Sequence, residues 1–241
     1  GHIMFDEEQY IEWAKKFNFG LISIIGGEPL LHPGILSYVI GLRQLWPDTG
    51  MIITSNGFQI NKVKNLYQTC LDNNCGVEIS FHDKDDLDVR LWEEIDKFKA
   101  ASGSAWKEIE TEIVHHVGRD GEKFTTESRT MEDDNGFKFL FTDAHFFATT
   151  SIKNFDGTTP MPHNSNPEKA YHDCSLKFSH TFFDGELYKC GFIAAGKEFV
   201  KSRGAEEHWK KLFDYQPITM DTLDDNWRDR FFAAEDVCSL C

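Results

Sequence analysis

The sequence contains no run of about 18 apolar residues, the length that a helix needs to cross a bilayer. Its amino terminus has no basic segment followed by an apolar stretch, the pattern of a secretory signal. The chain has 40 Asp and Glu but only 25 Lys and Arg, and the Lys and Arg residues are nowhere concentrated in the sequence. The resulting net charge of -15 repels phosphate backbones. We therefore expect a soluble, cytoplasmic protein that binds neither membrane nor nucleic acid.

No cysteine precedes Cys70, and the chain has no internal repeat or low-complexity tract. Hydrophobic residues make up 40% of the 241 residues, which is enough for a sizeable core in one large domain or a domain with a small appendage. The six cysteines include a terminal C-x-x-C. In a chain of this length without a signal, that pattern favours metal or cluster binding over disulfides.

Short apolar runs alternate with helical patterns in the first hundred residues. The runs at 21–25, 51–54 and 77–81 predict strands, the first of them buried. Helices are expected after each run, the first opened by Pro33 and the second capped by Asn61. The expected inner face of the first of these helices is Leu36, Val39, Ile40 and Trp46. Three successive strand–helix units predict parallel strands with helical crossovers, hence an α/β fold.

The alternation weakens beyond residue 100. Strands are expected over 109–117, 137–141 and 144–152, with a polar, hairpin-like stretch between the first two. The segment 154–166 is rich in Gly, Pro, Thr and Asn and predicts a long loop or linker. We therefore expect a main domain over 1–153 and a small extension over 154–241. Within the extension, Asp184-Gly185 between short apolar runs predicts a β-hairpin.

The first predicted strand ends in Gly26-Gly27-Glu28-Pro29. Ligands of parallel α/β folds bind at the carboxyl edge of the sheet, where this turn would lie. Glycines let a ligand approach the main chain closely, and Pro29 fixes the exit of the turn. The carboxylate of Glu28 suits a cationic group such as an ammonium. From these four residues alone, a tight turn with a solvated Glu is an equally good interpretation.

The stretch from Ile24 to Pro33 closely resembles the second-strand motif of the radical S-adenosylmethionine (radical SAM) superfamily. In that family the Gly-Gly-Glu-Pro backbone and carboxylate hold the amino group of SAM. The turn Thr54-Ser55-Asn56-Gly57 likewise resembles the family's Thr-Asn-Gly turn, although a turn alone explains it as well. The SAM-binding residues that the resemblance implies are Gly26, Gly27, Glu28, Pro29, Ser55 and Asn56. Further candidates at the end of the next strand are Ser80, His82 and Asp83.

The resemblance implies a partial (β/α) barrel entered at its second strand, and an oxidoreductase. In such enzymes a [4Fe–4S] cluster, reduced by a donor such as flavodoxin or ferredoxin, cleaves SAM to a 5′-deoxyadenosyl radical that attacks a small molecule or peptide. Relatives hold this cluster through C-x3-C-x2-C, and no such triplet precedes Gly26. We expect an amino-terminally truncated chain rather than a degenerate relative. In either case, this chain alone should be inactive.

A second constellation consists of Cys174, Cys190, Cys238 and Cys241. Residues 184–191 resemble the Gly-x-x-Tyr-x-Cys hairpin of SPASM and twitch extensions, which hold auxiliary iron–sulfur clusters. Four thiolates can saturate one [4Fe–4S] cluster or one zinc ion, and their spacing does not choose between the two. The alternatives are four unrelated thiols, or a non-catalytic binding module stapled by metal. Cys70 and Cys75 are predicted to be core residues.

Overall fold

The computed structural model describes the chain except for residues 1–3, 82–85, 118–122, 144–151, 154–158 and 175. It divides into two compact units, 1–145 and 146–241. The division falls slightly before the boundary at 153/154 expected from the sequence. Most of the strand predicted at 144–152 lies outside the described residues.

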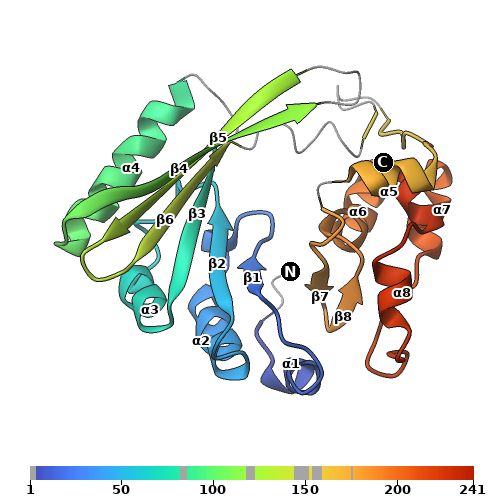
Figure 1. Ribbon diagram of the computed structural model, residues 1–241, viewed down its shortest axis with the longest axis horizontal. Helices are drawn as coiled ribbons and strands as arrows, with labels where there is room; N and C mark the ends of the chain where they lie inside the picture. The colour runs from blue at the N-terminus through green and yellow to red at the C-terminus, as the bar shows by residue number, and fades with distance from the viewer. Residues whose placement is uncertain (1–3, 82–85, 118–122, 144–151, 154–158, 175) are drawn as a thin grey trace. The chain divides into compact units, whose positions relative to one another are not determined.

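The amino-terminal unit is built on a six-stranded sheet in the order β1-β2-β3-β6-β5-β4 (Figure 1). The strands are β1 (Leu21–Ile24), β2 (Gly50–Ser55), β3 (Cys75–Phe81), β4 (Trp106–Val117), β5 (Lys123–Asp133) and β6 (Lys138–Asp143). Neighbours among β1, β2, β3 and β6 pair in parallel, whereas β5 pairs antiparallel with both β6 and β4. The prediction of an α/β fold with parallel strands is therefore confirmed.

One face of this sheet is apolar and covered by helices. The helices of the unit are α1 (Glu7–Ala14), α2 (Ile35–Leu45), α3 (Leu66–Asp72) and α4 (Asp86–Ser102), with a short 3-10 helix η1 (Pro29–Leu31). Alternate residues of β3 are buried, as expected for a strand with one covered face. On that face Phe81 and Phe141 pack against Trp92 of α4, and Phe139 packs against Phe98. The half-exposed residues of β3, which alternate with the buried ones, lie on the opposite face of the sheet.

Two predictions about burial in this unit were wrong. The strand β1 is not buried: it lies at the edge of the sheet, and its Leu21 side chain is 63% exposed. The inner face of α2 was predicted in part: Val39 and Trp46 are buried as expected, but Ile40 is exposed, and Ile35 and Leu42 are buried in its place. Both errors follow from reading every apolar residue as buried, although folded surfaces retain many apolar side chains.

Two predictions about element limits also need correction. Asn61 does not cap a helix, since α3 starts later, after Asn65; the Asn61 amide instead donates to the carbonyl and carboxylate of Glu94. The stretch between the strands predicted at 109–117 and 137–141 contains a complete strand, β5. Its pairing with β4 and β6 on both sides compensates for its polar sequence.

The carboxyl-terminal unit is a small assembly of short elements around its own core. They are α5 (Pro167–Asp173), β7 (Thr181–Phe183), β8 (Glu186–Tyr188), α6 (Gly191–Ser202), η2 (Glu206–His208), α7 (Lys210–Asp214), α8 (Trp227–Phe231) and η3 (Asp236–Leu240). The predicted hairpin is confirmed, with Asp184 and Gly185 at φ 52° and 78° between β7 and β8. Trp209 and Leu212 are completely buried in the core of this unit.

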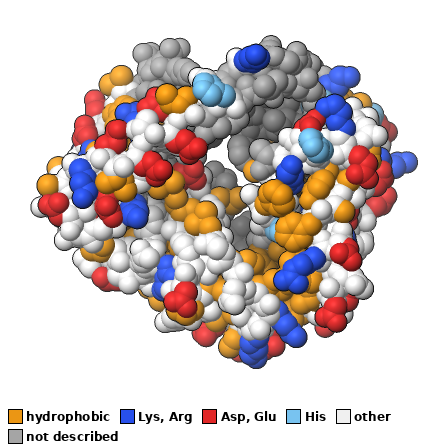
Figure 2. Space-filling view, viewed as in Figure 1, with side chains coloured by type: hydrophobic (Ala, Val, Ile, Leu, Met, Phe, Trp, Pro, Cys, Tyr) orange, Lys and Arg blue, Asp and Glu red, His pale blue; other side chains and the backbone are white. Residues whose placement is uncertain are grey.

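Among the described residues, no helix is long and apolar enough to span a membrane. Asp and Glu side chains, red in Figure 2, are spread over the visible surface with Lys and Arg side chains among them. This distribution accords with the excess negative charge of the sequence.

Candidate functional site

The Gly-Gly-Glu-Pro turn follows β1 directly and leads into η1. Glu28 has extended backbone and is the N-cap of η1, while Pro29 is buried at the first position of that helix. Proline suits this position because its missing N–H would have no partner inside the helix. The predicted turn thus lies at the carboxyl end of an edge strand, beside the equivalent end of β2.

The carboxylate of Glu28 joins this turn to the end of β2. Its Oε1 accepts hydrogen bonds from the Leu30 backbone N–H at 3.0 Å and from the Ser55 hydroxyl at 2.7 Å. Its Oε2 accepts one from the Asn56 backbone N–H at 2.9 Å. A carboxylate offers about four lone-pair positions, so three are used and one on Oε2 remains. Glu28 is therefore fixed in place by the chain and retains capacity for one further donor.

Gly26 and Gly27 are exposed, and nothing in the described structure explains why they are glycines. Neither has a φ in the left-handed region, and a Cβ added to either would meet no described atom within 4 Å. Gly57 provides the contrast: its φ is +80°, and a Cβ there would lie 2.6 Å from Leu91 Cδ1. The backbone at Gly26 and Gly27 is therefore bare and open to the approach of another molecule.

Ser55 and Asn56 contact Glu28 but differ in exposure. Ser55 is 2% exposed, and its Oγ both donates to Glu28 and accepts from the Gly57 N–H at 2.9 Å. The Asn56 side chain accepts from the Phe58 N–H. Ser55 therefore positions Glu28, and direct contact of either residue with SAM stays a prediction.

Ser80 lies near the end of β3, half-exposed on the face of the sheet opposite the helices. That placement is consistent with a residue facing a ligand, although no contact tests it. The candidates His82 and Asp83 lie outside the described residues.

One residue that the sequence analysis missed lies on the same face as Ser80. Glu78 occupies the middle of β3, and its carboxylate accepts hydrogen bonds from the hydroxyls of Thr54 and Thr142. The signal was present in the sequence, because Glu78 is a charged residue at an alternate position between buried Val77 and Ile79. A charge within an apolar strand calls for a partner or a function.

The four candidate cysteine ligands of the carboxyl-terminal unit come from three segments. Cys174 is the C-cap of α5, Cys190 is the N-cap of α6, and Cys238 and Cys241 lie in and just after η3. The segment before α5 is tied to η3 by backbone hydrogen bonds from His163 N–H to Leu240 O and from Ser165 N–H to Ser239 O. All four cysteines are free and half-buried.

Electrostatic effects show that these thiols are neighbours. The pKa of the Cys190 thiol is raised to about 12, mainly by burial and in part by negative charge on Cys241 and Cys174, against the lowering effect of hydrogen bonds from the Ile193 and Phe192 N–H groups. Burial likewise raises the pKa of Cys238, to which Cys174 also contributes. The fold thus gathers the four thiols in one region and keeps at least two of them protonated at neutral pH.

A buried ammonium lies in the same region. The Lys189 side chain is 4% exposed, and its Nζ donates to the carbonyls of Arg230, Phe231 and Ala233 at 2.9, 3.0 and 2.7 Å. It also forms an ion pair with Glu235 at 3.3 Å. Its positive charge lowers the pKa of Cys238 against the effect of burial. Sequence reasoning missed Lys189, because a lysine beside a cysteine gives no sign of burial.

The four thiols of this region are suitable metal ligands, but their arrangement is not that of a metal site. Four thiols are the ligands that an iron–sulfur cluster or a structural zinc ion requires. Within the described part of the chain, however, no three His, Cys, Asp or Glu side chains are arranged so that they could hold a metal ion. The ligand chemistry therefore fits, whereas the ligand geometry is not preformed. Cys70 and Cys75 are buried, 0% and 3% exposed, which confirms them as core residues.

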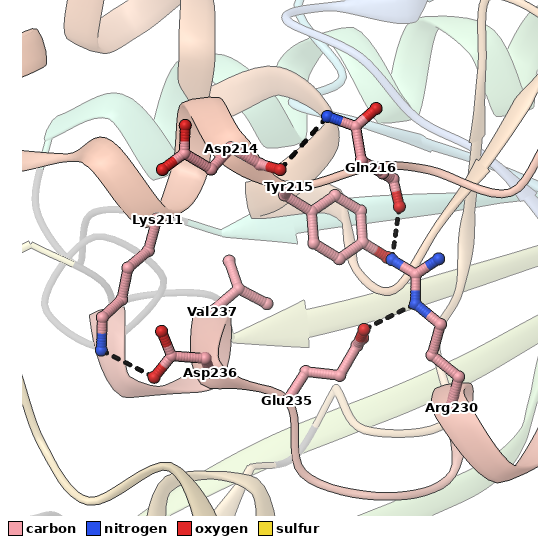
Figure 3. A pocket seen from close by; sticks show the side chains of 8 residues that line it. All are labelled: Lys211, Asp214, Tyr215, Gln216, Arg230, Glu235, Asp236 and Val237. Atoms are coloured by element: carbon pink, nitrogen blue, oxygen red, sulfur yellow. Dashed lines mark hydrogen bonds and ion pairs between the residues drawn. The ribbon is translucent and has the colours of Figure 1, made fainter.

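A pocket of about 320 Å³ is also present in the carboxyl-terminal unit, and Figure 3 shows its lining. Two ion pairs lie in the lining: Lys211 with Asp236 at 2.8 Å, and Arg230 with Glu235 at 2.6 Å. Arg230 additionally donates to the Gln216 carbonyl. Four of the five charged side chains of the lining are thus paired with one another, and the fifth is the carboxylate of Asp214.

These observations define two candidate regions: the open glycine turn with Glu28 at the end of β1, and the four cysteines around Lys189. Comparison with known proteins finds no relative of the chain: no protein-family model matches the sequence, and no curated protein is significantly similar to it.

Proposed function

We propose that the chain is the SAM-binding part of a radical SAM enzyme, with a partial (β/α) barrel and an auxiliary cluster region of the SPASM or twitch kind. The observation that carries the proposal is the bare backbone of Gly26 and Gly27 beside Glu28. Their glycine identity is required neither by a left-handed φ nor by contacts with the described residues. A ligand that lies against the main chain supplies the missing reason.

The residues of this turn suit the aminoacyl end of SAM. The carboxylate of Glu28 is held by Ser55 and by two backbone N–H groups, and retains one acceptor position on Oε2. An ammonium donates to such a position in a charge-assisted hydrogen bond. Electron transfer from a [4Fe–4S] cluster, whose cysteine triplet is absent from these 241 residues, would supply the radical chemistry. The part of this chain is to bind and orient SAM.

The test is SAM binding by calorimetry to the chain and to two variants. Gly27→Ala should leave the melting temperature unchanged, since its Cβ meets no described atom within 4 Å, yet weaken SAM binding at least about tenfold by blocking close approach. Glu28→Gln should weaken it similarly by removing the charge. Glu110→Gln, an exposed carboxylate on β4, serves as the matched control and should bind normally. Unchanged affinity in Gly27→Ala would contradict the proposal.

A further inference from the structure

A row of hydrogen-bonded polar side chains crosses four neighbouring strands of the sheet. Ser23 of β1 lies 2.9 Å from Thr54 of β2, measured between the hydroxyl oxygens. The Thr54 hydroxyl donates to Glu78 Oε2 of β3 at 2.7 Å, and the Thr142 hydroxyl of β6 donates to Glu78 Oε1 at 2.9 Å. We call Ser23, Thr54, Glu78 and Thr142 the Glu78 row.

The Glu78 row lies on the face of the sheet that the helices leave uncovered. In β3 the residues on either side of Glu78, Val77 and Ile79, are completely buried toward the helices. Successive side chains of a strand point to opposite faces, so Glu78 and Ser80 point away from the helices. Glu78 is half-buried and Ser23 is exposed. A solute can therefore reach the row.

The direction of each hydrogen bond follows from the chemistry of the row. An ionised carboxylate only accepts, so Thr54 and Thr142 each give their single hydroxyl proton to Glu78. Because the Thr54 proton is used in this way, the proton between Ser23 and Thr54 comes from Ser23. All three hydroxyl protons are thus consumed within the row. What the row presents outward is acceptor lone pairs alone, together with one negative charge.

That charge has no cationic partner among the residues that the structure describes. No ion pair involves Glu78, and Lys138, the lysine of the adjacent strand β6, pairs with Glu132 instead. Two hydroxyls fill about half of the lone-pair positions of a carboxylate. A half-buried carboxylate that lacks a counter-charge attracts a cation, and one surrounded by acceptors favours a cation rich in N–H donors.

We propose that the Glu78 row is a binding site for a protonated amine or a guanidinium group. The row and the glycine turn are linked through consecutive residues at the end of β2: Thr54 contacts Glu78 on the uncovered face, and buried Ser55, which points to the opposite face, contacts Glu28. The identity of the cation rests on the proposed function, which supplies two candidate sources for it. The group then belongs either to the substrate or to SAM itself.

The experiment follows the backbone amides of the isotope-labelled chain by NMR during titration with n-butylammonium, and with n-butanol as the uncharged probe. We expect saturable shifts in β2, β3 and β6 with butylammonium, at concentrations at least about tenfold below any effect of butanol. Glu78→Gln should weaken butylammonium binding at least about tenfold, whereas Glu112→Gln, an exposed carboxylate on β4, should not. Thr142→Val provides a second, uncharged test, because it removes one donor that holds the carboxylate.

Equal responses to butylammonium and butanol, or equal affinity in Glu78→Gln, would overturn the proposal. Titration with SAM distinguishes the two sources of the cation. If SAM shifts the same amides and loses affinity in Glu78→Gln, the row holds the ammonium of SAM and the role proposed for Glu28 is wrong; if not, the row serves a second ligand. Gly27→Ala separates this site from the proposed function, because that variant should lose SAM but keep butylammonium.

Discussion

The amino-terminal sheet unit and the carboxyl-terminal cysteine unit satisfy their functional groups differently. At the end of β1, Glu28 is held by donors from its own chain, so the turn is complete without a ligand. In the second unit, burial keeps the Cys190 and Cys238 thiols protonated, and no set of metal ligands is preformed among the described residues. From this difference we expect that a ligand at the first region would meet a preformed site, whereas metal binding at the second would require rearrangement and loss of protons.

The largest expected effect of this difference is that metal stabilises only the second unit. Iron with sulfide, or zinc, added to the reduced chain without oxygen should raise its unfolding free energy by about 4 kcal/mol at a thousandfold excess over the dissociation constant. The measurement is metal content together with thermal unfolding. Visible charge-transfer absorption would identify an iron–sulfur cluster, and stoichiometric colourless zinc would favour the metal-stapled binding module.

Two variants serve as controls for this metal effect. Cys190→Ser should remove the stabilisation, because it deletes one of four ligands. Cys70→Ala should retain it, since Cys70 is buried in the other unit. Retention of the full metal content by Cys190→Ser would show that the four cysteines do not act together.

An intermediate effect concerns Lys189, a buried charged group of the second unit that is already satisfied by partners from the chain. Lys189→Met should lower the free energy of unfolding by about 2–4 kcal/mol, because three backbone carbonyls lose a charged donor. Lys211→Met is the matched control: its ammonium pairs with exposed Asp236, and we expect a loss of at most about 1 kcal/mol. Urea denaturation measures both. If the two variants lose the same free energy of unfolding, burial of Lys189 contributes nothing beyond an exposed ion pair.

The sequence predicted best what local patterns determine. The strands before Gly26 and Ser55 were found because short apolar runs end there at turn residues, and the β7–β8 hairpin because Asp184-Gly185 suits left-handed backbone. Cys70 and Cys75 were placed in the core because free cysteine packs as a small hydrophobic residue, and Cys70 lies on the apolar side of its predicted helix. Each of these predictions depends on residues within one or two turns of chain.

What the sequence could not predict depends on partners far along the chain. Ser55 and Asn56 contact Glu28 across 27 and 28 positions, and Thr142 contacts Glu78 across 64. The strand β5 is polar, and only its pairing with neighbours on both sides makes it a strand. Burial of Lys189 likewise depends on carbonyls more than forty residues later. Such contacts become visible only once the register of the strands and helices is known.

The smallest expected effect is the change in the stability of the second unit with pH. The ordinary thiol pKa of 9.0 is raised to about 12 at Cys190, mainly by burial. Below pH 9 both folded and unfolded states hold the proton; above it the unfolded thiol ionises first, so the metal-free unit loses stability until the folded thiol also ionises. At pH 10 the loss should be about 1 kcal/mol, measured by urea denaturation between pH 8 and about pH 10.

Cys190→Ala should flatten this pH dependence, and an unchanged slope in that variant would contradict the assignment to Cys190. Loading with metal should reverse the sign, because bound metal requires thiolates and its affinity therefore rises with pH. SAM binding at Glu28 should weaken over the same range, because an α-ammonium has an ordinary pKa of about 8 and its neutral amine no longer forms a charge-assisted hydrogen bond with the carboxylate. Opposite responses of the metal-free and metal-loaded chain would show that metal binding at the cysteines requires loss of their protons.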